Sequence, residues 1–133
     1  MGHLAALRFE SPMGPVHGDA HAGNLMVDQR GRVHLIDLEN FCVDHAEWDL
    51  VVAAHEFDRL GWAVEEQYTA FSGAYGRDLR EWPGFRTLCA IQEFRMTTWL
   101  MQNVGEGPEV AEEVMKRIAS LRDDDAPRHW RPY

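Results

Sequence analysis

The sequence HGDAHAGNLMVDQRGRVHLID, from His17 to Asp37, decides how the first part of the chain folds. Within it, residues 25–27 and 33–36 are two short runs rich in Leu, Val and Ile. The segment between the two runs is polar and contains Gly31. Apolar, β-branched runs joined by a polar turn with a glycine predict a β-hairpin.

Three polar residues flank this predicted hairpin. Asn24 immediately precedes the first strand and Asp37 follows the second, so antiparallel pairing sets the two side by side. Asp19 lies upstream on a glycine-containing loop, from which it can reach the same place. Mg²⁺ in proteins binds oxygen atoms, commonly from one or two carboxylates together with substrate phosphates. The sequence therefore predicts a magnesium site at this end of the hairpin.

The order of the three residues also fits phosphoryl transfer. That reaction needs a cation to neutralise developing charge and a group that orients the attacking hydroxyl and accepts its proton. An H-x-D-x-x-x-x-N loop followed by a second aspartate is the order in which kinases supply these groups. Asp19 is therefore the expected catalytic base, and Asn24 and Asp37 are the expected metal ligands. Taken singly, each could be a turn residue or a helix cap, so the ordered set carries the prediction.

The segments HGDAHAGN and VHLIDLEN resemble the aminoglycoside phosphotransferase family, whose relatives include choline kinase-like and other small-molecule kinases. The resemblance is close from His17 to Ala54 and implies the C-terminal catalytic lobe of a protein-kinase-like fold. It also implies ATP and Mg²⁺ as cofactors and a small-molecule hydroxyl as phosphate acceptor. Asp49, in the segment EWDLV, resembles a family aspartate that supports the catalytic loop from beneath.

The histidines around the loop have a structural and a chemical interpretation. We expect His17 to hold the loop by hydrogen bonding, and His21 to shape the loop or to contact phosphate, and so to bind the cofactor together with Asn24. The alternative is a metal-dependent hydrolase that uses His17, Asp19 and His21, with His34 as a further ligand. Intervening glycines break any helix that would align His17 with His21, and strand alternation turns His34 away from Asp37.

Composition indicates a water-soluble domain and excludes some partners. The chain has 133 residues, of which 45% are hydrophobic and 26% charged, and no apolar run approaches the ~20 residues that span a membrane. Its two cysteines, Cys42 and Cys89, form neither a metal motif nor a disulfide framework, which predicts a cytoplasmic location. The net charge of −9 argues against nucleic acid and is compatible with a cationic acceptor, held by Glu39, Asp44 or Glu47.

Downstream of the hairpin the sequence predicts helices, so the expected class is α+β: a small hairpin followed by a mainly helical bundle. Asp44 is a plausible cap for the first helix, and Gly76 should end the second. Pro108 suits the first turn of the last helix. The expected divisions of a single domain are an irregular lead-in (1–16), the catalytic loop and hairpin (17–40), a helical region (44–122, with helices at 47–57, 62–75, 85–102 and 108–122) and a tail (123–133).

Features that kinases place before the catalytic loop have no counterpart in the residues before His17. Those residues contain no glycine-rich phosphate loop and no strand lysine, so the N-terminal lobe is expected to be absent. Three explanations fit: a truncated piece of a longer kinase, a catalytic lobe completed by a partner or by a second copy, or a non-catalytic remnant with a binding or assembly role. Apolar surface left uncovered by a missing lobe predicts a homo-oligomer or a complex with a partner that supplies it.

Overall fold

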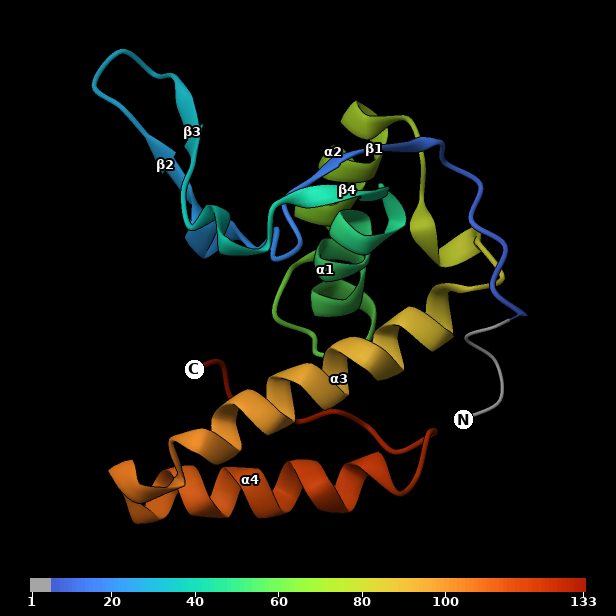
Figure 1. The fold of residues 1–133 in the computed structure, drawn as a ribbon. Coiled ribbons are helices and arrows are strands. Elements are labelled where there is room, and N and C mark those ends of the chain that lie inside the picture. The colour runs from blue at the N-terminus through green and yellow to red at the C-terminus, as the bar shows by residue number, and fades with distance from the viewer. Residues whose placement is uncertain (1–5) are drawn as a thin grey trace.

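A computed structural model describes residues 6–133 as an α+β fold with two small antiparallel sheets and four α-helices (Figure 1). The strands are β1 (Met13–Val16), β2 (Leu25–Val27), β3 (Val33–Leu35) and β4 (Cys42–His45). The α-helices are α1 (Glu47–Asp58), α2 (Glu65–Tyr75), α3 (Phe85–Gln102) and α4 (Pro108–Leu121). Short 3₁₀ turns, including η2 (Ala22–Asn24) and η3 (Leu38–Asn40), connect some of them.

The predicted hairpin is confirmed. Strands β2 and β3 pair antiparallel with Leu25 opposite Leu35, and Gly31 in the turn has a φ of 76°, a conformation that glycine adopts at little cost. The hairpin projects away from the helices, and all six strand residues are exposed (Figure 1). Asn24 and Ile36 meet at its base, where the Ile36 amide donates to the Asn24 carbonyl at 3.0 Å.

A second sheet, which the sequence did not predict, corrects two expected boundaries. Strand β1 pairs antiparallel with β4, with Gly14 opposite Asp44. The lead-in is therefore a strand from Met13 onward, and the helical region begins at Glu47 rather than at residue 44. Asp44 does not cap α1: its carboxylate accepts from the adjacent His45 amide, and the helix is preceded by Ala46. Residues 1–5 of the expected lead-in lie outside the described part.

The main core joins α1, α2 and α3. Leu50, Val51 and Ala54 of α1 pack with Tyr68 of α2 and with buried residues around the start of α3, namely Leu79, Trp82, Phe85, Leu88 and Cys89. Helix α2 ends at Gly76, which has a φ of 87°, as predicted. It begins at Glu65 rather than at Trp62, after the left-handed Gly61 (φ 65°) and the extended Val64.

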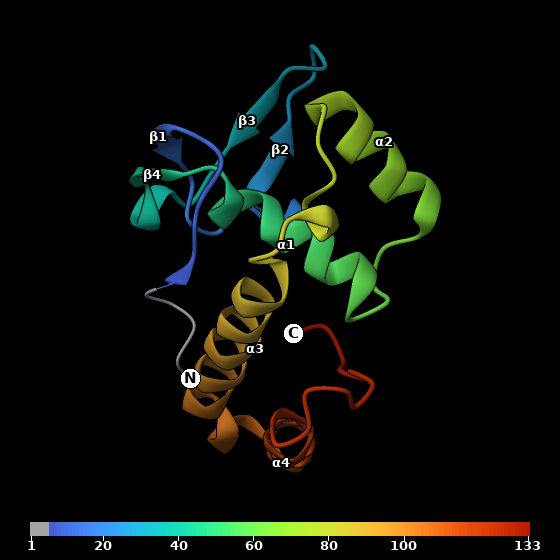
Figure 2. The ribbon, with the colours of Figure 1, turned by 90° about the vertical axis from the view of Figure 1, so that its right-hand side faces the viewer.

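Helices α3 and α4 lie side by side, and Figure 2 shows α4 nearly end-on beneath α3. A smaller apolar cluster of Leu100, Val110 and Val114 joins them. The tail has no regular structure, as expected, but it is firmly packed. Arg128 is buried and donates from Nε to the buried Glu93 carboxylate of α3 at 3.0 Å, which fixes the tail against the helices.

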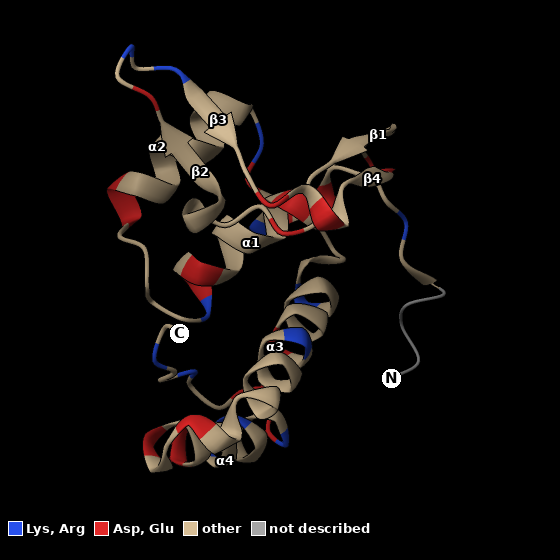
Figure 3. Ribbon diagram, turned by 60° about the vertical axis from the view of Figure 1, so that its left-hand side comes forward, with Lys and Arg blue, Asp and Glu red and all other residues tan. Residues whose placement is uncertain are grey.

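The surface is acidic and, around the hairpin, apolar. Figure 3 shows acidic residues over several helices and basic residues at the hairpin tip. Large apolar side chains are exposed on the hairpin and the segment after it: Leu25, Met26, Val27, Val33, Leu35, Ile36, Leu38, Phe41 and Val43. In the part of the chain that the structure describes, no helix has the length and hydrophobicity to cross a membrane.

Candidate functional site

The loop that begins at His17 follows β1 directly and is held by α1. The Asp49 carboxylate, in the first turn of α1, accepts from the backbone amides of His17 (2.7 Å) and Gly18 (2.8 Å). Gly18 has a φ of 82°, and a Cβ at this position would lie 2.6 Å from the Asn40 carbonyl oxygen. Only glycine fits both the backbone conformation and the space at this turn.

The buried ring of His17 connects the loop to the end of β3. Its Nε2 lies 2.8 Å from the Ile36 carbonyl oxygen, and its Nδ1 accepts from the Asp19 amide at 3.3 Å. Because an amide can only donate, Nδ1 accepts and Nε2 carries the proton that is given to Ile36. Both ring nitrogens are thus used in shaping the backbone on either side of Asp19 and Asp37.

Asp19 and Asn24 are in direct contact. The Asn24 Nδ2 donates to the Asp19 carbonyl oxygen at 2.9 Å and lies 3.4 Å from its carboxylate Oδ2. This orientation leaves the Asn24 Oδ1 without a donor among residues 6–133. The His21 Nε2 lies 3.5 Å from the same Oδ2, while its Nδ1 accepts from the Gly23 amide. The Asp19 side chain is 39% exposed and therefore accessible to a substrate.

Asp37 has an unusual backbone. Among residues 6–133 it is the only non-glycine residue with a positive φ, which is 57°. Such conformations concentrate at functional sites. It precedes the turn η3, but its side chain makes no capping hydrogen bond. Its carboxylate therefore has no structural task within residues 6–133, and the explanation as a helix cap does not apply.

A cleft of about 650 Å³ contains these acidic groups. Its lining includes Asp19, His21, Asp37 and Glu39 from the motif segment and several residues of α3. Aromatic side chains, Trp62, Trp99 and Tyr133, and the carboxylate of Glu56 complete the lining. The volume falls in the usual range for small-molecule sites.

The donor set suits Mg²⁺ better than a transition metal. Asp37 offers a carboxylate in the cleft lining, and Asn24, which is buried beside the cleft-lining residue Asp19, offers its amide oxygen; both are hard oxygen ligands. The described residues hold no cluster of three His, Cys, Asp or Glu suited to a metal ion. The hydrogen bonds argue against a hydrolase site built from His17, Asp19 and His21, because His17 is committed to backbone contacts and the exposed His34 lies 3.1 Å from the Asp28 carboxylate.

The sequence prediction missed the lining residues that come from α1 and α3. Glu56 has no hydrogen-bond or ion-pair partner for its carboxylate among the described residues, and burial raises its pKa above the usual value although His21 and His55 oppose this. Arg95 of α3 also lines the cleft. Both residues lie on helices downstream of the motif, and only tertiary packing brings them near Asp19.

Of the three carboxylates expected to hold a cationic acceptor, only Glu39 lines the cleft. Glu47 is fully buried and serves the fold instead: it accepts from the amides of Glu10 and Ser11 (both 2.9 Å) and from Arg77 (2.9 Å). Burial alone would raise the pKa of Glu47, but these hydrogen bonds and that of the Ser11 hydroxyl lower it to about 2. Asp44 is part of strand β4.

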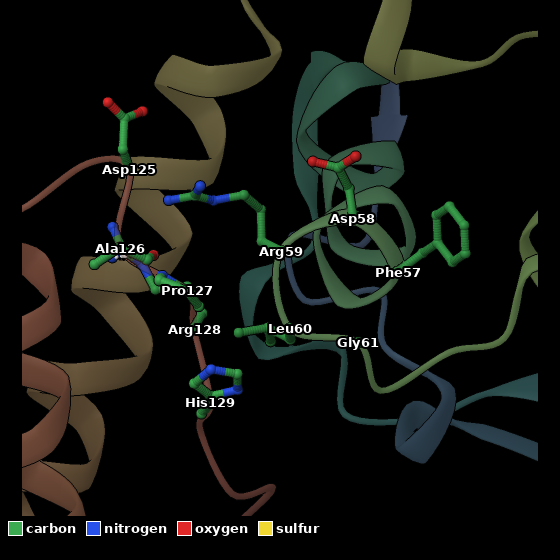
Figure 4. A pocket seen from close by; sticks show the side chains of 10 residues that line it. All are labelled: Phe57, Asp58, Arg59, Leu60, Gly61, Asp125, Ala126, Pro127, Arg128 and His129. Atoms are coloured by element: carbon green, nitrogen blue, oxygen red, sulfur yellow. Dashed lines mark hydrogen bonds between the residues drawn. The ribbon is translucent and has the colours of Figure 1, made fainter.

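A second hollow, of about 320 Å³, lies between the end of α1 and the tail (Figure 4). Residues 57–61 form one side and residues 125–129 the other. None of the residues of the His17–Asp37 motif lines it. Arg59, which borders it, already pairs with Glu93 at 3.0 Å, and the carboxylates of Asp58 and Asp125 border it as well.

Residues 6–133 thus form an α+β domain in which Asp19, Asp37 and Glu39 line one cleft. The sequence model described as the phosphotransferase enzyme family (APH) matches residues 1–91. This match covers more than half of the 133 residues, so the chain belongs to that family. Searches among curated proteins and among solved structures returned no match.

Proposed function

We propose that the chain is a catalytic lobe that transfers the γ-phosphate of ATP to a hydroxyl of a small molecule. The observation that supports this most directly is that Asp19 and Asp37 line one open cleft, with the buried Asn24 in direct contact with Asp19. Asn24 and Asp37 would hold Mg²⁺, which neutralises phosphate charge when bound. The same residues in a non-catalytic remnant would bind a metal nucleotide without turning it over.

Asp19 acts as the base in this proposal. Its carboxylate orients the acceptor hydroxyl and takes its proton as the acceptor oxygen forms a bond to the γ-phosphorus. The bond between the γ-phosphorus and the bridging oxygen to the β-phosphate breaks, and ADP leaves with that electron pair. Asn24 holds the Asp19 backbone, and Asp49 and His17 hold the loop on either side, so the carboxylate is pre-oriented before the acceptor arrives.

The lining of the cleft favours an acceptor that carries a positive charge. Trp62 and Trp99 offer aromatic side chains, whereas the Tyr133 ring already lies 5.9 Å from the Arg117 guanidinium. Glu39 and Glu56 line the cleft without an ion-pair partner among the described residues. Amines bind to such combinations of aromatic rings and carboxylates. An amino alcohol is therefore the proposed acceptor class.

The metal assignment is tested by nucleotide binding. Asp37→Asn keeps the size of the side chain and tolerates the left-handed backbone, but it removes the charge. We expect it to weaken Mg²⁺-dependent ATP binding, measured by calorimetry with and without Mg²⁺, by about tenfold or more. Asp58→Asn, an exposed substitution at the end of α1, is the matched control. Equal Mg²⁺-dependent binding in Asp37→Asn and wild type would remove Asp37 from the site.

A further inference from the structure

The backbone of the catalytic loop has contacts on two sides. Its amides at His17 and Gly18 are bound by Asp49 of α1, as described above. The Gly18 carbonyl points to the opposite side, toward Arg95 of α3, whose Nη1 and Nη2 lie 3.5 and 3.4 Å from it. The Arg95 guanidinium therefore lies beside the residue that immediately precedes Asp19.

The hydrogen bonds of Arg95 leave one edge of its guanidinium unused. The Nη1 atom also donates to the Gln92 side chain at 3.2 Å. The acceptors of Arg95, the Gly18 carbonyl and the Gln92 amide oxygen, are therefore neutral and at long distances. The Nε hydrogen and the second Nη2 hydrogen have no acceptor among residues 6–133. These two hydrogens form the parallel pair with which arginine binds two oxygens of a phosphate or carboxylate.

Arg95 is also the cleft cation that is free to take a ligand. Arg117, which lines the cleft too, is buried and bonded to Glu113 and to the carbonyl oxygens of Met96 and Arg131. His21 lies against Asp19. Within the described chain, Arg95 has no carboxylate within ion-pair distance, although the cleft that it lines is rich in carboxylates.

We propose that Arg95 binds phosphate oxygens in this cleft and is the positive charge that the protein itself places beside the transferred phosphoryl group. The inference rests on the proposed function for the identity of that group. It goes beyond the family match, which ends at residue 91 and does not include Arg95. The Arg95 guanidinium is held by Gly18 and Gln92. Its positive charge would offset the repulsion between the carboxylates of Asp19 and Asp37 and an entering anion.

The test measures binding of inorganic phosphate by NMR at constant ionic strength, with EDTA present so that no metal contributes. The Nε–Hε resonance of Arg95 is identified by its absence in Arg95→Lys. We expect saturable phosphate binding that shifts this resonance, weakens about tenfold or more in Arg95→Gln, and is intermediate in Arg95→Lys, which keeps the charge but not the paired donors.

The matched control is Arg86→Gln. Arg86 is an exposed arginine of the same helix that also donates a long hydrogen bond to a backbone carbonyl, that of Asp124 at 3.3 Å, and lies 3.8 Å from the exposed Asp125 carboxylate. It should bind phosphate as the wild type does. Three results would overturn the proposal: no saturable binding by the wild type, equal losses in the Arg86 and Arg95 variants, or acetate binding at least as tight as phosphate.

A further variant separates this proposal from the proposed function. Asp19→Asn removes the base but leaves Arg95 in place, so turnover should be lost while phosphate binding is kept or becomes tighter. If the wild type shows no turnover yet binds phosphate through Arg95, the proposed function fails and the phosphate site stands. Loss of phosphate binding in Asp19→Asn, with the fold intact by circular dichroism, would contradict the role given to Arg95.

Discussion

Replacement of Asp49 by asparagine tests how the loop is held. The carboxylate accepts two short hydrogen bonds, from His17 and Gly18, and each hydrogen bond to a charged group contributes about 1.5–3 kcal/mol. The asparagine oxygen can replace one acceptor, but the amide nitrogen then faces the other backbone N–H. One amide is left unpaired, so Asp49→Asn should lower the free energy of unfolding by about 2–3 kcal/mol.

Urea unfolding followed by circular dichroism measures this change. Asp58→Asn is the control, because Asp58 is an exposed residue at the other end of the same helix, where a negative charge is slightly unfavourable. It should change stability by less than about 0.5 kcal/mol. If Asp49→Asn destabilises no more than Asp58→Asn does, the carboxylate does not hold the loop and the reasoning is wrong.

Three further predictions concern acid stability, the tail and association. Because the folded pKa of Glu47 is about 2 and the unfolded value is 4.5, its ionised form stabilises the fold above pH 4.5, and this contribution is lost as pH falls toward 2. Urea unfolding should thus find Glu47→Gln less stable than wild type at pH 7, and the difference in unfolding free energy should narrow as the pH falls from 4.5 toward 2. A difference that stays constant over this pH range would contradict the lowered pKa. Glu93→Ala leaves two buried or half-buried arginines without their partner and should cost about 3–5 kcal/mol, accompanied by faster proteolysis in residues 123–133; an unchanged digestion pattern would contradict the anchoring role. The exposed apolar hairpin should drive self-association that Val27→Lys combined with Val33→Lys reduces, whereas a monodisperse wild-type monomer by light scattering at high dilution would refute this.

The elements that could be predicted from the sequence are those with local signals. The hairpin has β-branched strands and Gly31 at its turn, α2 ends at Gly76, and α4 begins at Pro108. In each case the backbone preference of one residue type acts within a few positions of the element it limits. The backbone hydrogen bond between Ile36 and Asn24 at the base of the hairpin follows from the same local pairing.

What could not be predicted depends on contacts between distant segments. Strands β1 and β4 lie on either side of the motif, and the MGPV sequence of β1 has no typical strand pattern. The sequence suggested that Glu47 could hold a cationic acceptor. Its actual partners, Ser11 and Arg77, are about 30 residues or more away along the chain and could not be recognised from it. Arg95 carries no motif at all, and only the packing of α3 against the loop shows that it borders the cleft.

The measurement that most directly tests the central claim is ATP turnover in the presence of Mg²⁺ and an amino alcohol, with the wild type and Asp19→Asn compared at matched nucleotide saturation. Loss of a general base typically slows a reaction by about 10²–10⁴-fold. We expect a loss of that size in turnover, with Mg²⁺-ATP binding retained because Asn24 and Asp37 are unchanged. Turnover that survives in Asp19→Asn, or a wild type that neither binds nor turns over millimolar ATP, would contradict the assignment of this cleft as a phosphoryl-transfer site.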